Sequence, residues 1–396
     1  MNNKPDAGTF NRRTCLAAIA SPLLGHPVVQ AQTAAKAPAK AEAKTEAKGV
    51  EIIIGQSAPL SGSMAILVSD LLDGQNAAIT DINKRGGVNG RPIKLITLDD
   101  AYEPKRTLEN AKTLVEREQA VALFGVVGTA QSAAVLPYVA ERIMPLISIY
   151  SGSPALRSGN NPYLFTTQAS YTDELVKMVR NLVTLRSTKI AVVYQNNELG
   201  KLLLPVAEKV LAAEGATMAA SLPLQVDGRD SNAVAQQIAA NKPNAIILIV
   251  AGPAVVPFVK ANKALSGVPV YTFSLSVGGA TLKGLGEDAR GLAVARSTPY
   301  PWRATNALTR DFNAAMKRHK YPIDYGHFTG YINGRILIEG IRSAGKNVSP
   351  EGIYQGMEKL GRLDLGGYAL NFGPNNHHGS NFVEITIVGP NGTFMR

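Results

Sequence analysis

Hydroxyl-bearing side chains gather where two apolar runs of this chain end. The first run, 123–127, ends in Gly128 and Thr129, and the second, 144–149, ends in the tetrapeptide Tyr-Ser-Gly-Ser at 150–153. Hydroxyl groups and the free backbone N–H groups of a helix N-terminus attract carboxylates. The types and spacing of these residues therefore predict that the two loops bind a small anion.

The two loops are expected to meet at one edge of a parallel sheet. Neighbouring strands deliver their carboxyl ends to the same edge, and open α/β sheets bind ligands there. Each hydroxyl taken singly could also cap a helix or satisfy a turn. The candidate ligand contacts on this side are Ser61, in a turn-rich loop after the first strand, and Gly128, Thr129, Tyr150, Ser151, Gly152 and Ser153.

The sequence contains no motif for covalent or cofactor chemistry. No Gly-x-Gly-x-x-Gly follows a strand, and neither a Gly-x-Ser-x-Gly elbow nor a Walker-type Gly-Lys-Ser/Thr is present. Asp99 and Asp100 could act as paired acids, but at a strand end we expect them to cap a turn. His377 and His378 could hold a metal, but we expect a solvated turn. We therefore predict no catalytic residue, no metal and no cofactor.

Charge argues against a nucleic-acid partner. The 396-residue chain is 45% hydrophobic and 18% charged, with a formal net charge of +11. Its basic residues are scattered, with the tightest group at 317–320, and aromatic residues are not interleaved with them as in a single-strand-binding groove. We interpret the positive charge as solvated surface.

The first 49 residues are predicted to lie outside the fold. Residues 1–31 combine an arginine pair, a short apolar run and small residues at a cleavage position, which is the pattern of a secretory signal peptide. The pair indicates either the general secretory or the twin-arginine route. Residues 32–49 form an Ala/Lys/Glu/Pro tract that we expect to be a flexible tether. Cys15, the only cysteine, falls in the signal, so we expect an exported protein without disulfides.

Strand and helix patterns alternate along the rest of the chain, which predicts an α/β fold with parallel sheets flanked by helices. Two such arrays are joined near residues 166–167, and the C-terminal part departs from simple alternation. Strands are expected at 50–56, 91–98, 121–125, 189–194, 217–224, 245–250, 268–273, 291–296, 368–372 and 382–388. Helices are expected at 70–84, 104–118, 171–185, 199–214, 231–240, 254–265, 303–318, 325–344 and 350–360.

Several motifs resemble those of a known family. They include Ile54-Gly-Gln-Ser-Ala-Pro-Leu-Ser-Gly, the run Asp81-Ile-Asn-Lys-Arg-Gly-Gly-Val-Asn-Gly-Arg-Pro-Ile, and Gly125 to Ser132. Pro145-Leu-Ile-Ser and Gly286-Glu-Asp-Ala-Arg-Gly-Leu extend the likeness, which covers residues 50–396. On these residues the chain resembles the periplasmic solute-binding proteins of ABC importers, of the branched-chain amino-acid (leucine/isoleucine/valine) binding type.

The resemblance implies the type I periplasmic-binding-protein fold, with two Rossmann-like lobes joined by a three-stranded hinge and a ligand trapped as the lobes close. The expected crossings are Thr166–Ala169, Ala295–Thr298 and Leu363–Gly367. We accordingly assign residues 50–167 and 298–365 to the first lobe, and residues 168–297 and 366–396 to the second.

The resemblance also implies site residues. Members of the family hold an amino-acid carboxylate with the loop matching Gly128-Thr129 and the turn matching 150–153, although Gly152 stands where leucine-type members have threonine. The second lobe departs further. The position of a covering aromatic is occupied by Leu199, that of a tyrosine by Ala251, and that of the ammonium-binding carboxylate by Ser274, while Tyr171 could supply an aromatic surface.

A buried ammonium without an acidic partner costs several kcal/mol, of order 5. Either another acid serves, of which Glu198 is the nearest in sequence, or the ligand has no α-ammonium. The leading hypothesis is a monomeric periplasmic receptor that delivers a branched-chain or other apolar amino acid to the membrane subunits of an ABC permease. The alternatives are a receptor for an aromatic or keto/hydroxy acid, or a ligand sensor with the same fold. An enzyme of doubly wound fold would need the motifs that are missing.

Overall fold

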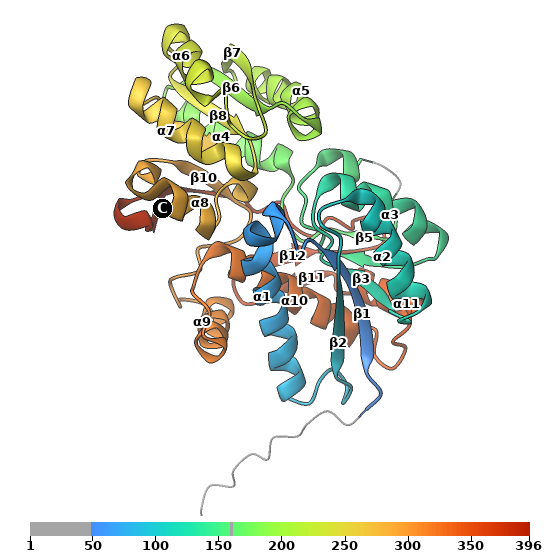
Figure 1. Cartoon of the computed structure of the whole chain (residues 1–396). Helices are drawn as coiled ribbons and strands as arrows, with labels where there is room; N and C mark the ends of the chain where they lie inside the picture. The colour runs from blue at the N-terminus through green and yellow to red at the C-terminus, as the bar shows by residue number, and fades with distance from the viewer. Residues whose placement is uncertain (1–48, 159–160) are drawn as a thin grey trace, which may run out of the picture. The chain divides into compact units, whose positions relative to one another are not determined.

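The computed structural model describes residues 49–158 and 161–396, which fall within one compact unit, Lys44–Arg396 (Figure 1). The predicted signal peptide, and the predicted tether up to residue 48, lie outside the described residues. In the described part of the chain, no helix is both long and apolar enough to cross a membrane.

The first sheet has five parallel strands in the order β2-β1-β3-β4-β5. Because β3 and β4 are neighbours, the loops that follow them start side by side, and a parallel bridge between Val127 and Tyr150 continues the pairing beyond both strands. The predicted meeting of the two loops is thereby confirmed. The strands are β1 (Ile52–Ala58), β2 (Ile93–Asp99), β3 (Ala122–Phe124), β4 (Leu146–Ile147) and β5 (Leu164–Phe165).

Helices cover both faces of this sheet, and together they form the first lobe. One core holds side chains of α1 (Ser63–Lys84), α9 (Ala307–His319), α10 (Tyr325–Ser343) and α11 (Pro350–Lys359), and the other holds those of α2 (Pro104–Glu116) and α3 (Thr129–Glu141).

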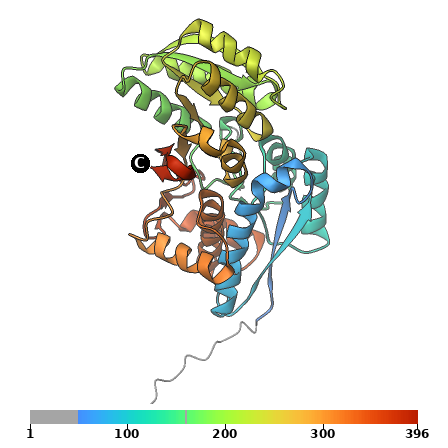
Figure 2. The same ribbon diagram turned by 60° about the vertical axis from the view of Figure 1, so that its left-hand side comes forward.

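Helices α1 and α10 lie backbone to backbone, although 240 residues separate the end of α1 from the start of α10 in the sequence (Figure 2). Glycines permit this approach. A Cβ added at Gly74 would lie 2.1 Å from the carbonyl oxygen of His327, and one at Gly330 would lie 2.0 Å from that of Leu71. The contact brings the first turn of α10 against the middle of α1.

The second sheet has seven strands in the order β14-β13-β10-β9-β8-β6-β7. Strands β6 to β10 are parallel, whereas β13 runs antiparallel to β10 and to β14. The strands are β6 (Lys189–Gln195), β7 (Thr217–Leu224), β8 (Ala245–Ile249), β9 (Val270–Thr272), β10 (Ala293–Arg296), β13 (Glu384–Val388) and β14 (Phe394–Met395).

Helices again flank both faces of this sheet, and together with the sheet they form the second lobe. Those on one face are α4 (Tyr171–Thr184) and α5 (Glu198–Ala213), and those on the other are α6 (Ser231–Asn241), α7 (Val255–Leu265) and α8 (Gly279–Leu285). The predicted fold class is therefore confirmed.

Helix α1 begins seven residues before its predicted start at residue 70, directly after Gly62 at φ 78°. Periodicity missed these turns because they lack a continuous buried stripe: Ile66 is 68% exposed, and Leu67 faces a cleft described below. Strands β4 and β12 (Ala369–Asn371) fall within the predicted runs 144–149 and 368–372. The patterns missed β5 and β14, which have two residues each, α8, and β11 (Arg362–Asp364), which pairs with β12 in a hairpin.

Three chain segments connect the two lobes, and they bond to one another. The hydroxyl of Tyr368 donates to the carbonyl oxygen of Thr167 at 2.8 Å and lies 3.2 Å from that of Ser297. Thr166 also forms a parallel bridge to His378. Segments distant in sequence thus form one hydrogen-bonded junction.

We place the last crossing later in the chain than the expected 363–367. Tyr368, Leu370 and Phe372 are still buried in the first lobe's core, while β13 of the second sheet begins at Glu384. We therefore propose that residues 373–383 make this crossing, and that residues 366–372 belong to the first lobe, not the second. The reason is physical, since the apolar side chains of the β12 region pack with α9–α11.

Candidate functional site

A cleft with many polar side chains in its walls is formed by residues of both lobes. Its wider part is lined by α1, α10, the end of β10 and the loop after β9, and its narrower part by the turn after β4 and the start of α4. Tyr150, Ser274 and Leu275 line both parts, so the two parts are continuous.

The first-lobe wall carries the predicted hydroxyl groups. Thr129 and Ser151 share a hydrogen bond between their hydroxyl oxygens at 2.7 Å, and the Ser151 oxygen also accepts from the backbone N–H of Ser153 at 3.2 Å. Burial raises the pKa of Tyr150 to about 12, so its hydroxyl stays a neutral donor. Ser151 lines the cleft, whereas Thr129 stands behind it and orients it.

Gly152 packs closely against the aromatic ring of Tyr171. A Cβ at this position would lie 2.5 Å from Cδ1 of Tyr171, and the backbone N–H of Tyr171 donates to the carbonyl oxygen of Gly152 at 2.7 Å. The Tyr171 ring packs edge-on against Phe273 with centroids 5.5 Å apart. A side chain at position 152 would therefore displace Tyr171, so the position of that ring requires glycine here.

The second-lobe wall contains an acid. The carboxylate of Glu174 accepts hydrogen bonds from the backbone N–H and the hydroxyl of Ser274, each at 2.8 Å. A capping box between Ser170 and Asp173 fixes the start of α4 and so positions Glu174 in its first turn. Burial raises the pKa of Glu174 to about 7, while the two bonds from Ser274 and the charge of Arg296 act in the opposite direction.

Glu198, the acid nearest in sequence to the predicted site, is not placed there. Its side chain is 82% exposed and pairs with Lys201 at 3.6 Å. It lines neither part of the cleft. Glu174 is the acid that the cleft contains beside Ser274.

Sequence reasoning did not single out Glu174 or Arg296, yet each left a signal. Glu174 lies three residues after Tyr171 and four before Met178 on the buried face of α4, where a carboxylate is unusual. Arg296 ends the buried strand β10 and is 3% exposed. In both cases a charge within an apolar pattern pointed to a role other than solvation.

Of the predicted ligand residues, the structure places Tyr150, Ser151, Gly152, Tyr171 and Ser274 in the cleft walls. The others lie elsewhere. Ser61 donates to Asp99 at 2.7 Å, Leu199 packs against the core between α4, α5 and the sheet, and Ala251 accepts from Gln195 at 3.0 Å. Gly128 caps α3 at φ 105°, and Ser153 is 2% exposed beside Ser151. Ligand contacts at all eleven predicted positions stay predictions.

The two acids at the end of β2 shape a turn, as expected. Asp99 accepts from Ser61 and from the backbone N–H groups of Leu60 and Ala101, and these bonds lower its pKa to about 2. Asp100 accepts from Ser57 and Thr107.

The expectation of a solvated turn was wrong for His377, whose side chain is largely buried. The ring of His377 is 10% exposed, stacks on Phe165 and lies 3.1 Å from a carboxylate oxygen of Glu358. His378 shares a hydrogen bond with Thr166. The aromatic side chains under this loop pack against the ring of His377, which sequence patterns in the loop could not indicate.

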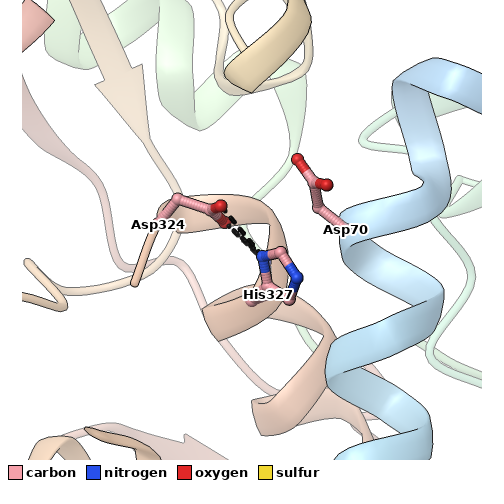
Figure 3. A group of neighbouring side chains, drawn as sticks. All are labelled: Asp70, Asp324 and His327. Carbon is pink, nitrogen blue, oxygen red and sulfur yellow. Dashed lines mark hydrogen bonds and ion pairs between the residues drawn. The ribbon is translucent and has the colours of Figure 1, made fainter. Parts of the chain in front are cut away.

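Asp70, Asp324 and His327 form a group beside the cleft (Figure 3). Nδ1 of His327 lies 2.9 Å from the Asp324 carboxylate, while Asp70 approaches from α1. Burial and the charge of Asp324 raise the pKa of Asp70. Burial alone would lower the pKa of His327, but its bond to Asp324 and the nearby acids raise it overall. The group therefore adds titratable side chains beside the cleft, and one ligand atom from each lies within 4.8 Å of the others, so the group could hold a metal ion.

Known proteins show the same architecture. A family model described as "Periplasmic binding protein" matches residues 51–392. The "Amino acid binding protein" of Pseudomonas aeruginosa is 39% identical over 75 residues, 19% of this chain and 20% of that protein. The "Leu/Ile/Val-binding protein BraC3" of Rhizobium johnstonii is 26% identical over 196 residues, 48% of this chain and 52% of that one. The alignments thus span from a fifth to about half of these relatives.

Solved structures match over nearly their whole length. A substrate-binding periplasmic protein from Ralstonia solanacearum has a TM-score of 0.78 at 28% identity, covering 87% of this chain and 99% of that one. A branched-chain amino acid ABC transporter protein from Thermus thermophilus with bound valine has 0.79 at 18%, covering 87% and 94%. A solute-binding protein from R. palustris in complex with benzoate has 0.76 at 18%, covering 87% and 95%.

The similarities to the Thermus thermophilus and R. palustris structures, each at 18% identity, support only the fold. The family model, in contrast, matches most of the chain. This family comprises solute-binding proteins rather than enzymes. With its two flanked sheets and a cleft built from both, the chain belongs to the periplasmic binding protein family.

Proposed function

We propose that this protein captures a branched-chain or other apolar amino acid between its lobes and delivers it to the membrane subunits of an ABC permease. The observation that carries the proposal is Glu174, a buried carboxylate in the cleft wall that two hydrogen bonds from Ser274 hold in place. Glu174 supplies an acidic partner for the ammonium group of a ligand. Position 274, which carries a serine, has no carboxylate of its own.

The two walls offer complementary groups to an amino acid. On the first lobe, the Ser151 hydroxyl and the neutral Tyr150 hydroxyl are donors for the α-carboxylate. On the second lobe, Glu174 faces the same narrow part of the cleft and accepts from the α-ammonium, with the Tyr171 ring beside it. The ligand's apolar side chain then extends along Leu67, Leu71 and Val277 in the wider part.

The raised pKa of Glu174 fits this role. A carboxylate whose pKa is about 7 is held near the midpoint of its titration by burial at neutral pH. An incoming ammonium favours the ionised form, because an opposite charge in a buried site offsets the cost of desolvation. Ligand binding therefore completes an ion pair for which Ser274 has already fixed one member.

A second candidate ligand is an aromatic or keto acid without an ammonium. The same observation supports it, since a protonated Glu174 donates a hydrogen bond to an anion instead of accepting one. The relative with bound benzoate supports this option, as the relative with bound valine supports the first. The protonation state of Glu174 in the complex separates the two.

We further propose that the protein works as a monomer in the periplasm, to which residues 1–31 direct it. This location rests on the family and on the leader pattern. Delivery to a permease rests on the relatives that are named as transporter components.

A thermal-shift screen of the protein without its leader tests the proposal. Leucine, isoleucine and valine should raise the melting temperature, because a ligand at one hundred times its Kd stabilises by about 2.7 kcal/mol. The Glu174→Gln variant should lose most of this shift while still unfolding in one cooperative transition without ligand. If the aliphatic amino acids leave the melting curve unmoved while benzoate or the 2-oxo acid analogue of leucine raises it, the amino-acid assignment is wrong. If none of these acids moves it, the carboxylate class is wrong.

A further inference from the structure

Arg296 is a buried cation in the cleft wall that the proposed contacts do not use. It ends β10, is 3% exposed, and lines the wider part of the cleft. Its guanidinium carbon lies 4.2 Å from the ring centroid of Tyr325 and 4.6 Å from that of Phe394. Nη1 donates to the carbonyl oxygens of Val277 at 2.9 Å and Ser274 at 3.3 Å. Rings and carbonyls therefore fix the position and plane of the guanidinium.

The opposite edge of the guanidinium is free. Nε and Nη2 are buried, and neither has a hydrogen-bond partner among residues 49–158 and 161–396. These two atoms share one edge, and their N–H groups are parallel and spaced to match the two oxygens of a carboxylate. In the same part of the chain, no carboxylate forms an ion pair with Arg296, although a buried charge is stable only when it is paired.

Ser274 connects this cation to the acid across the loop. Its backbone N–H and hydroxyl bond to Glu174, and its carbonyl oxygen accepts from Nη1 of Arg296. Tyr150 lies close enough to both charged groups for each to affect its pKa, the arginine lowering it and the glutamate raising it. Ser274 thus holds both the carboxyl group of Glu174 and the guanidinium of Arg296 in the cleft wall, where one ligand can contact both.

We propose that Arg296 binds the carboxylate of the ligand through Nε–H and Nη2–H. The proposal rests on the proposed function and deepens it by naming the residue that makes a carboxylate obligatory. The hydroxyl groups of Tyr150 and Ser151 supply neutral donors, and Arg296 supplies the charge. A planar bidentate contact distinguishes an acid from its amide, because an amide has no negative charge and its NH₂ group opposes an N–H donor.

The test compares affinities for acids and their amides, using L-leucine with L-leucinamide and benzoate with benzamide. Trp302, the only tryptophan, lies 5.3 Å from the Tyr325 ring that packs on Arg296, so its fluorescence can report binding. In the wild-type protein, whichever of the two acids binds should bind at least about 30-fold more tightly than its own amide, as expected for a buried charge pair.

Arg296→Met should reduce this acid-to-amide ratio to within about 3-fold, since removing one partner of such a pair costs 2 kcal/mol or more. Arg296→Lys keeps the charge but loses the paired edge, so its ratio should fall between the two. The matched control is Arg335→Met, because Arg335 also packs on a tyrosine ring, that of Tyr331 at 5.9 Å, but pairs with Asp311 outside the cleft. Its ratio should equal that of the wild type.

A ratio is insensitive to a general loss of affinity, so a merely structural role for Arg296 would leave it unchanged. If Arg296→Met fails to fold, the ratio in Arg296→Lys decides. An unchanged ratio in the folded variant overturns the inference and leaves the proposed function standing. If neither acid binds the wild-type protein, the proposed function is rejected and the inference with it.

Discussion

Glu174 and Ser274 are 100 residues apart in the sequence, yet both the backbone N–H and the hydroxyl of Ser274 donate to the Glu174 carboxylate at 2.8 Å. The serine occupies the position at which relatives were expected to carry the acid. Helix α4 supplies the acid instead, from the other side of the loop. Under the proposed function, Glu174 would take over the role of the acid that is absent from position 274.

The titration of Glu174 should be visible in the stability of the ligand-free protein. Its pKa is about 7 in the folded state against 4.5 for a free carboxyl, so between these values the native state holds a proton that the unfolded state has lost. Stability must therefore fall as pH rises through this window, by about 3 kcal/mol. Urea unfolding of the wild-type protein at about pH 5 and pH 8 measures the change.

The matched variant for this prediction is Glu174→Gln, which cannot titrate and retains the other ionisable groups, including His327 and Asp70. The pH dependence of its stability should be flatter than that of the wild type. Equal pH dependence in the two proteins would mean that Glu174 is ionised throughout, contrary to the account.

Gly152→Ala should weaken ligand binding. The new Cβ would lie 2.5 Å from the Tyr171 ring, so the ring must move, at a cost of about 1–3 kcal/mol typical of overpacking. Calorimetric titration with the best ligand measures the loss of affinity. Gly278→Ala is the control, because Gly278 lines the same cleft but has no atom within 4 Å of an added Cβ. Similar affinities for the two variants would argue against the role given to Tyr171.

Asp81→Asn should destabilise the first lobe. Asp81 is 4% exposed and joins α1 to the end of α9 through Arg318 and through His319 at 2.9 Å. Burial raises the pKa of this carboxyl, but the two basic partners lower it overall, so its contribution is present above about pH 4 and is lost as pH falls through the lowered value.

We expect Asp81→Asn to cost about 1–3 kcal/mol at neutral pH, measured by urea unfolding. Glu116→Gln, which removes the exposed pair with Arg142, should change stability by less than about 0.5 kcal/mol. The prediction fails if the buried and the exposed substitutions cost the same.

Tyr368→Phe should loosen the junction between the lobes. Tyr368 is 2% exposed, and its hydroxyl lies between the carbonyl oxygens of Thr167 and Ser297, which belong to two crossings. Removing it leaves buried acceptors unsatisfied, at a cost of about 1–3 kcal/mol. Thermal unfolding measures this cost, and hydrogen exchange at residues 166–169 reports the local opening.

Tyr138→Phe is the control, because that hydroxyl bonds to a half-exposed carboxylate of Glu116 that water can solvate. It should cost less than Tyr368→Phe. Unchanged exchange at 166–169 in Tyr368→Phe would show that the tyrosine does not hold the crossings together.

The sequence predicted the parts of this molecule that follow from local patterns. Buried β-branched runs gave β1, β6 and β8, and Gly128-Thr129 marked the start of α3 beside the end of β4. Patterns could not give the contact between Glu174 and Ser274, because it depends on packing between elements 100 residues apart. They also missed the free edge of Arg296, which depends on what surrounds a side chain and not on its neighbours in the chain.

The central claim is that Glu174 binds the ammonium of an amino acid, and the pH dependence of leucine affinity tests it most directly. With a pKa of about 7, roughly a tenth of Glu174 is ionised at pH 6 and nine tenths at pH 8, while leucine keeps its ammonium. Calorimetric titration should therefore show leucine binding about tenfold tighter at pH 8 than at pH 6, with no such change in Glu174→Gln. Leucine affinity that stays constant or falls over this range would contradict the account.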